Sequence, residues 1–252
     1  MRINGPRPSL GRLTIAATLL MGFLNPALAG PPYRTDDPEP TDYEHYEIYA
    51  FTNGIVAGDG TNGAGGIDFN YGGAPNLQLS ATLPAGYTFS NGGPFVGGLS
   101  NIELAAKYRF LTQANFGLDV AVFPRVFLPS ASPNVGESHA SFLLPIWVEK
   151  DWDKWSAFGG GGCEINRGGN SQDFCLAGLV ITNQITSKLQ VGLEMFHQTS
   201  DTQGSSATTS LGTGVRYDLN EHYHLLGYVG RGIVNAEAND RVDWYAAVLF
   251  TF

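Results

Sequence analysis

The sequence has few charged residues, few cysteines and no long apolar run beyond its N-terminus. Charged residues make up only 15% of the 252, and just 14 of them are Lys or Arg. With 23 acidic residues and a net charge of −9, the chain lacks the basic surface that nucleic acid binding needs, so we expect no nucleic acid partner. After residue 29, no apolar run approaches the ~20 residues of a spanning helix, which argues against a helical membrane bundle.

Residues 1–29 have the features of a cleavable export signal. Three Arg residues precede an apolar stretch, Leu13 to Leu24, which is too short to cross a membrane. The sequence Ala27-Leu28-Ala29 then forms a small-x-small cleavage site. Removal of this segment takes away three Arg and no acid, so the formal net charge changes from −9 to −12. We therefore expect a bacterial exported protein, in a compartment that permits disulfides.

The next segment, 30–41, is rich in proline and acidic residues and cannot form regular structure. Two placements are open for it. In the first, the segment folds into a barrel lumen as a plug, and its acidic residues pair with Arg109, Arg125 or Arg216. In the second, it is a flexible tail in the periplasm. Its composition favours neither placement.

From about residue 42 onward the hydrophobic pattern has a period of two, and no convincing helical period follows the signal. For example, the stretch from Asn76 to Leu83 alternates polar and apolar residues without a break, as expected for strands with one apolar and one polar face. Most predicted strands have 9 to 14 residues, long enough to span a membrane as tilted strands. The twelve predicted strands are roughly 42–55, 64–72, 76–88, 101–111, 116–129, 140–151, 154–166, 171–183, 188–199, 207–218, 223–235 and 241–252.

The connections and the C-terminus point to the same architecture. Connections after odd-numbered strands are long or rich in Gly, Ser and Asn, such as 90–100 and 129–140, whereas those after even-numbered strands, such as 112–115, are short. This asymmetry is typical of outer-membrane barrels. We predict an all-β, closed antiparallel transmembrane barrel of about 12 strands over 42–252, embedded in outer-membrane lipid and closed because open sheet edges are not tolerated there. One face of the last strand resembles the signal read by the barrel assembly machinery: Trp244, Ala246, Val248, Phe250 and Phe252.

Aromatic residues near predicted strand ends are expected to form an interfacial girdle. They are Tyr43, Tyr46, Trp147, Trp152, Trp155, Trp244 and Tyr245.

Charged residues within the strands are expected to face the lumen, because a Lys or Arg facing lipid at mid-depth costs about 2–4 kcal/mol. Their mixed signs fit either a conducting lumen or a filled interior in which every charge is paired. These lumen or selectivity candidates are Glu47, Asp68, Glu103, Lys107, Arg109, Asp119, Arg125, Glu149, Glu194 and Arg216.

The two cysteines, Cys163 and Cys175, flank a turn centred near Gly169, six residues from each. A symmetric hairpin would place them directly opposite each other, so a structural disulfide is the favoured interpretation. The sequence does not decide which face of the sheet the two cysteines lie on, because Glu164 and Asp173 imply opposite alternation around the turn.

Metal and catalytic sites have little support. His222 and His224 share a face by period two, but two ligands are fewer than a metal site needs, and we expect neither a metal nor another cofactor. A barrel hydrolase would need a nucleophile oriented by a base, and the nearest candidates are His197, Ser200 and Asp201. The spacing of His197 and Ser200 places them on opposite faces of a strand, so we expect no enzyme.

Several segments resemble a known family. They are Pro31 to Pro40, Tyr46 to Tyr49, Ile67 to Gly72, Glu103 to Phe110, Leu144 to Trp147 and the Gly159–Gly162 run. Together they are similar to the "putative MetA-pathway of phenol degradation" family of outer-membrane β-barrels, over most of residues 30–252. The resemblance implies a barrel of transporter type.

We therefore expect passive passage of small solutes, including hydrophobic or aromatic molecules, through a bacterial outer membrane. The alternatives are a non-conducting barrel with a structural or surface-interaction role and, less favoured, a lipid hydrolase.

Overall fold

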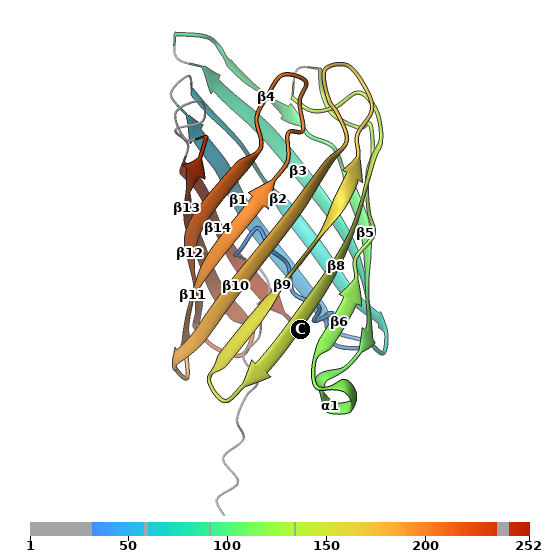
Figure 1. Cartoon of the computed structure of the whole chain (residues 1–252), viewed down its shortest axis with the longest axis vertical. Helices are drawn as coiled ribbons and strands as arrows, with labels where there is room; N and C mark the ends of the chain where they lie inside the picture. Colours follow the sequence, from blue (N-terminus) through green and yellow to red (C-terminus); the bar gives the residue numbers. More distant parts are fainter. Residues whose placement is uncertain (1–31, 58–59, 91, 134, 236–241) are drawn as a thin grey trace, which may run out of the picture.

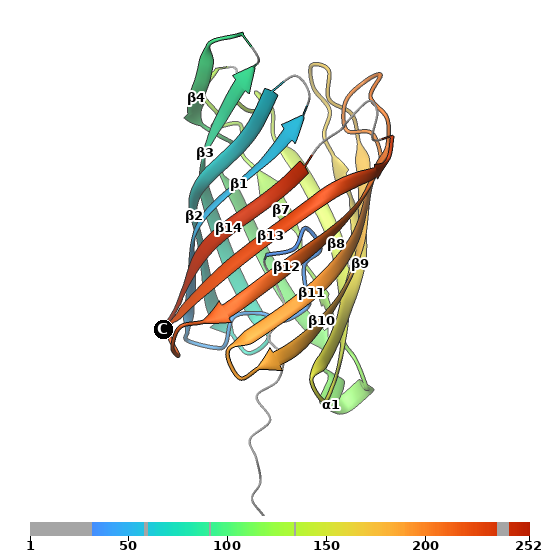
Figure 2. The ribbon, with the colours of Figure 1, turned by 90° about the vertical axis from the view of Figure 1, so that its left-hand side faces the viewer.

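The computed structural model describes residues 32–57, 60–90, 92–133, 135–235 and 242–252. These residues form a closed antiparallel β-barrel (Figures 1 and 2). The predicted export signal, 1–29, lies outside the described residues. The helix among the described residues is too short to cross a membrane.

The predicted twelve-stranded closed barrel is confirmed, although two of its strands are interrupted. β4 and β5 pair in succession along β3, and β6 and β7 pair in succession between β5 and β8, so fourteen segments make twelve wall strands. Pairing of β1 with β14 closes the barrel. The segments are β1 (Tyr46–Ala57), β2 (Gly60–Ala74), β3 (Leu77–Ser90), β4 (Phe95–Leu99), β5 (Glu103–Leu111), β6 (Asp119–Val122), β7 (Arg125–Phe127), β8 (Ser141–Trp152), β9 (Trp155–Ile165), β10 (Phe174–Thr186), β11 (Leu189–Gln198), β12 (Thr208–Asp218), β13 (Tyr223–Val234) and β14 (Val242–Thr251).

Three local expectations are wrong. Half of the predicted loop 90–100 is strand β4, which pairs with the upper part of β3. The predicted strand 116–129 is broken between β6 and β7, at a point where Pro124 has no N–H to donate to a neighbouring strand. A four-residue helix, α1 (Gln113–Phe116), occupies the connection where no helix was expected, and Gly117 ends it in the left-handed conformation.

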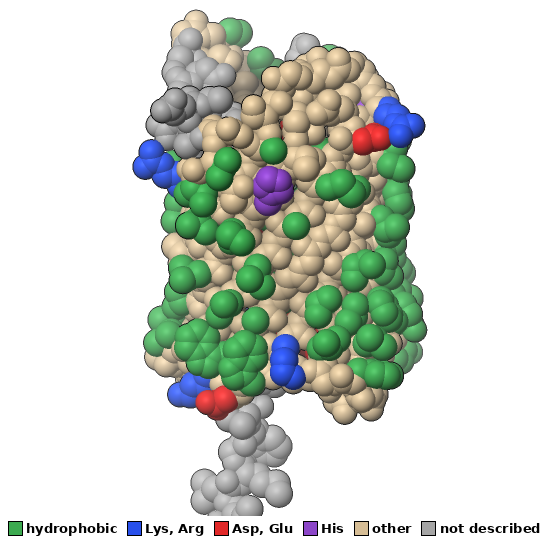
Figure 3. Space-filling view, viewed as in Figure 1, with side chains coloured by type: hydrophobic (Ala, Val, Ile, Leu, Met, Phe, Trp, Pro, Cys, Tyr) green, Lys and Arg blue, Asp and Glu red, His purple; other side chains and the backbone are tan. Residues whose placement is uncertain are grey.

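The wall is apolar outside, whereas its inner face mixes polar and apolar side chains. Along β8, the side chains of Phe142, Leu144 and Ile146 are exposed, whereas Leu143, Trp147 and Glu149 on the other face are buried. Figure 3 shows hydrophobic side chains over the middle of the visible face, with Lys, Arg, Asp and Glu side chains gathered near its two ends. An apolar outer band with charges at its margins is the surface that a bilayer requires.

The predicted aromatic girdle is wrong for two of its members. Trp147 is only 2% exposed and points into the lumen, in phase with its neighbour Glu149. Tyr245 also faces inward and stacks on Phe51 from β1. Successive residues of a strand alternate between faces, so Trp244 and Tyr245 cannot both lie on the lipid side.

The first wall strand begins, and the last one ends, at the short-turn end of the barrel. The backbones of Tyr46 and Phe252 exchange two hydrogen bonds of 3.0 Å there, at the base of the closing strand pair. The segment 32–41, called the arm below, lies inside the barrel between the walls (Figures 1 and 2).

Candidate functional site

The candidate site is the lumen at the level of the arm. Four prolines in 30–41 exclude helix and strand pairing, and the described part of the segment is a series of bends. The carboxylate of Asp37 accepts a 2.7 Å hydrogen bond from the backbone N–H of Glu39, which fixes a tight turn in the middle of the arm. The arm contacts β11 to β14 near its start, and β3 and β5 in its middle and near its end.

Tyr33 anchors the start of the arm against a wall built partly from glycine. Its hydroxyl donates a 3.2 Å hydrogen bond to the carbonyl of Gly214, and its ring packs edge-on against Phe158 and Tyr228. A Cβ on Gly192 or Gly214 would overlap the Tyr33 side chain. Burial, with a smaller contribution from the charge of a nearby glutamate, raises the pKa of the Tyr33 hydroxyl well above its ordinary value.

Thr35 and Arg34 join the arm to acidic residues of the wall. The buried backbone N–H of Thr35 donates a 2.7 Å hydrogen bond to Glu194 on β11. Arg34 donates a 3.1 Å hydrogen bond to Asp243 on β14, and its guanidinium lies 4.0 Å from the ring centroid of Phe196. The arm is therefore held by hydrogen bonds, charge and cation–π contact at once.

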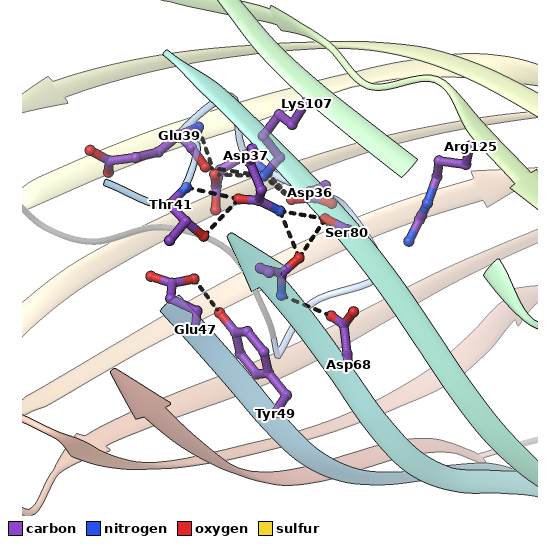
Figure 4. A network of polar contacts seen from close by, with 12 residues as sticks. Asp36, Asp37, Glu39, Thr41, Glu47, Tyr49, Asp68, Ser80, Lys107 and Arg125 are labelled. Carbon is purple, nitrogen blue, oxygen red and sulfur yellow. Dashed lines mark hydrogen bonds and ion pairs between the residues drawn. The ribbon is translucent and has the colours of Figure 1, made fainter. Parts of the chain in front are cut away.

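Lys107 on β5 binds the middle of the arm. Its Nζ lies 2.9 Å from Asp36 Oδ1 and 3.3 Å from Asp37 Oδ1, and it donates a third hydrogen bond of 3.2 Å to the carbonyl of Glu39. Lys107 is 4% exposed and Asp37 is 2% exposed. Figure 4 shows these groups converging on one ammonium. A buried cation costs several kcal/mol unless it is paired, and the arm supplies that pairing.

Two arm carboxyls are hard to ionise in this position. Burial raises the pKa of Asp37 to about 6, although the charge of Lys107 opposes that effect. Burial and the charge of Asp37 raise the pKa of Glu39 to about 7, against the opposing charge of Arg109. The docked arm therefore holds protons more tightly than a solvated arm would.

The end of the arm is fixed by β3 and β5. Arg109 lies 3.7 Å from the Glu39 carboxylate and 3.5 Å from that of Asp119 on β6. The backbone N–H of Thr41 donates a 2.8 Å hydrogen bond to the side-chain carbonyl of Gln78, whose amide donates in turn to Asn70.

Two cavities lie within the barrel. The larger, of about 430 Å³, lies between the arm and the wall near the short-turn end and is lined by Lys107, Phe123 and Asp68 among others. The smaller, of about 330 Å³, is lined by the polar Asn53, Asn101 and Glu164 together with residues of the long-loop end. Glu103 lines both, and it accepts a 2.6 Å hydrogen bond from Arg125.

All ten lumen candidates lie on the inner side of the wall, in phase with buried neighbours. Three of the candidates contact the arm: Lys107, Arg109 and Glu194. Arg125 pairs with Glu103 of the wall rather than with an acidic residue of the arm. The remaining contacts within the wall are those of Asp68 with Thr82, Glu47 with Tyr49, Glu149 with Ser156, Asp119 with Arg109, and Arg216 with Asp218 and His224.

Cys163 and Cys175 form a disulfide, with their Cα atoms 4.0 Å apart at directly opposed positions of β9 and β10. Both are exposed on the outer face, and Glu164 is buried on the inner face. Asp173 precedes β10 and pairs with Arg167 in the exposed turn, which removes the conflict in parity. The guanidinium of Arg167 holds the pKa of Asp173 below its ordinary range.

The histidines do not form a metal or catalytic cluster. His224 is buried and pairs with Asp218, whereas His222 is exposed in the turn before β13 and contacts the carbonyl of Thr251. In the part of the chain that the structure describes, no group of three or more His, Cys, Asp or Glu side chains could hold a metal ion. His197 contacts Thr209, while Ser200 bonds within its own loop.

Sequence reasoning missed several residues that position the arm. It proposed Arg109, Arg125 and Arg216 as partners for the arm acids, but only Arg109 has that role, and Lys107 is the main partner. It did not identify the glycines that face Tyr33 and Thr35. Glycine at successive lumen-facing positions of adjacent strands was the available signal: Gly178, Gly192 and Gly214.

Several solved structures share this fold, at identities that establish the fold alone. An outer membrane channel from Pseudomonas putida is 14% identical with a TM-score of 0.68, over 85% of this chain and 99% of that one. The KdgM porin in complex with disordered oligogalacturonate is 13% identical with a TM-score of 0.56, over 82% and 99% of the two chains. The NanC porin is 8% identical with a TM-score of 0.55, over 81% and 98%.

No curated protein matches the sequence. The model of the family described as "Putative MetA-pathway of phenol degradation" matches residues 47–241, which is most of the chain. The protein thus belongs to this family, and its closed β-barrel has the fold of the outer-membrane channels to which it is similar.

Proposed function

We propose that this barrel is a passive channel for small molecules whose conducting path is closed by the arm. The observation that carries the proposal is the position of the arm, which runs from the β11–β14 side of the lumen to Lys107 and Gln78 on the opposite side. Solutes pass when the arm leaves this position. The short-turn end, where the arm joins β1, faces the periplasm.

The lining of the lumen supports passage rather than a solid core. Cavities of about 430 Å³ and 330 Å³ lie within the barrel, and charged or amide side chains line both. A polar lumen selects solutes by width and charge. Hydrophobic or aromatic solutes, which the family description suggests, would pass along its aromatic side chains, such as Phe123 and Tyr49.

The extensive pairing of charges inside the barrel favours a second candidate, a non-conducting barrel with a structural role. Every member of a buried polar network has to be satisfied, and a network such as Arg125–Glu103 serves stability as well as selectivity. Conductance separates the two functions.

The experiment is single-channel recording of the refolded mature chain, 30–252, in planar bilayers. It is compared with a chain that begins at Asp42, and a heat-dependent shift in gel mobility checks that each barrel has folded. We expect few or brief openings from the mature chain and sustained conductance steps from the shorter chain. Equal, sustained conductance from both would contradict closure by the arm, and silence from both folded barrels would contradict the channel.

A further inference from the structure

Lys107 differs from the other lumen cations in where its partners come from. An ammonium has three donors, and among the described residues all three find acceptors in the arm: Asp36, Asp37 and the carbonyl of Glu39. No wall carboxylate in the described ranges lies within ion-pair distance of Lys107. By contrast, Arg125 has its own partner on the wall, Glu103.

The surroundings of Lys107 resemble a binding site occupied by a segment of the same chain. The ammonium borders the cavity of about 430 Å³. It lies 5.0 Å from the ring centroid of Phe123, which is 4% exposed, and Arg125 lies at the same distance from that ring. When the arm moves away, a buried cation on an apolar ring loses all of its acceptors.

We propose that Lys107 is the binding site for a small dicarboxylate solute, and that the arm acids Asp36 and Asp37 occupy this site as an internal mimic of that solute. This inference rests on the proposed function, because it concerns the same lumen. The solute supplies carboxylate oxygens in place of those of the arm, so its binding and the release of the arm are coupled. A ligand that binds only the open state shifts the arm equilibrium toward release.

A dicarboxylate fits the site better than a single halide ion does. Two separate carboxylates converge on one Nζ at 2.9 and 3.3 Å, and a carbonyl adds the third acceptor. One chloride can replace one of these acceptors, whereas a four-carbon dicarboxylate carries four oxygens. Charge-assisted hydrogen bonds of this kind are the strong ones in proteins.

The test uses the intact mature chain, with disodium succinate as the probe. Release of the arm is measured as the rate at which trypsin cleaves the bond after Arg34, followed by intact mass. Arg34 lies inside the barrel and pairs with Asp243 when the arm is docked. We expect saturating succinate to raise the cleavage rate roughly tenfold, which corresponds to one charged hydrogen bond at the low end of its usual range. Neutral succinamide, and sodium chloride at equal ionic strength, should not do so.

Variants separate the site from general loosening of the barrel. Lys107→Met should abolish the response to succinate whatever its basal cleavage rate, and Lys107→Arg should keep most of it. Asp36→Asn combined with Asp37→Asn should bind succinate roughly tenfold more tightly in calorimetry, because the competing carboxylates are gone. Glu47→Gln is the matched control, since Glu47 lines the same cavity but bonds Tyr49 rather than Lys107.

An equal response to succinate and to chloride would overturn the proposal, as would a full response in Lys107→Met. The channel itself is tested separately, by bilayer conductance of the Asp36→Asn, Asp37→Asn protein. Conductance without any succinate effect would reject the dicarboxylate site and leave the channel intact. Succinate binding in a barrel that never conducts would reject the channel.

Discussion

Substituting one wall glycine should release the arm. A Cβ on Gly192 would overlap the Tyr33 hydroxyl and lie 2.9 Å from Tyr33 Cζ, so in Gly192→Ala the ring has to move. Forcing an extra methyl group into a packed site costs about 1–3 kcal/mol, and the lost hydrogen bond from Tyr33 to Gly214 adds about 1 kcal/mol. We therefore expect docking of the arm to weaken by about 2–4 kcal/mol, which is at least roughly thirtyfold in the equilibrium constant.

The assay is the rate of trypsin cleavage after Arg34 in the folded mature barrel. Gly227→Ala is the matched control, because Gly227 is also a strand glycine but a Cβ there would meet only Val215, at an ordinary 3.5 Å. We expect at least a tenfold faster cleavage in Gly192→Ala and no change in Gly227→Ala. Tyr33→Phe should restore part of the protection by removing the overlapping oxygen. An unchanged rate in folded Gly192→Ala would refute the idea that Tyr33 holds the arm against this wall.

Three further predictions concern other parts of the molecule. Docking raises the pKa of Asp37 to about 6 and that of Glu39 to about 7, so the docked arm binds protons more tightly than the released arm, and raising the pH from 5 to 8 should favour release. Trypsin cleavage after Arg34, corrected for the pH dependence of the protease, should then be faster at pH 8 than at pH 5, and slower cleavage would contradict the prediction. Replacing Cys163 and Cys175 by Ser should lower the free energy of unfolding in urea by about 3 kcal/mol, because the unfolded chain gains the conformational freedom that the disulfide removes. An unchanged urea midpoint would argue against a stabilising role of the disulfide. Deleting Phe252 should reduce the yield of folded barrel in outer membranes, and normal assembly would contradict the role of the last strand as a recognition signal.

The sequence alone determined the wall of the barrel. A period of two over strands of about ten residues leaves one polar and one apolar face, and only a closed barrel buries the polar face and satisfies every backbone group in lipid. The same parity indicated the lumen side for charges such as Lys107 and Glu194, because the cost of a charge facing lipid is a local property. The opposed cysteines followed equally directly from the symmetry of one hairpin.

The interruptions of the wall could not be obtained from the period. Whether a proline interrupts a strand depends on whether its position would have donated a backbone hydrogen bond to a neighbouring strand. For Pro124 that depends on the register of three strands, which the periodicity does not give. Trp147 looked like an interfacial residue because it lies near a strand end in sequence, but its phase with Glu149 decides its face.

Only the tertiary structure decided the place of the arm. The arm has no periodicity, and its residues contact β3, β5 and β11 to β14, which lie far away in the sequence. Its acids could have paired with any lumen cation, and they pair with Lys107 because that ammonium has no acceptor of its own on the described wall. Closing the barrel fixes which cations are already paired, and this global property of the strand arrangement is absent from any local pattern in the chain.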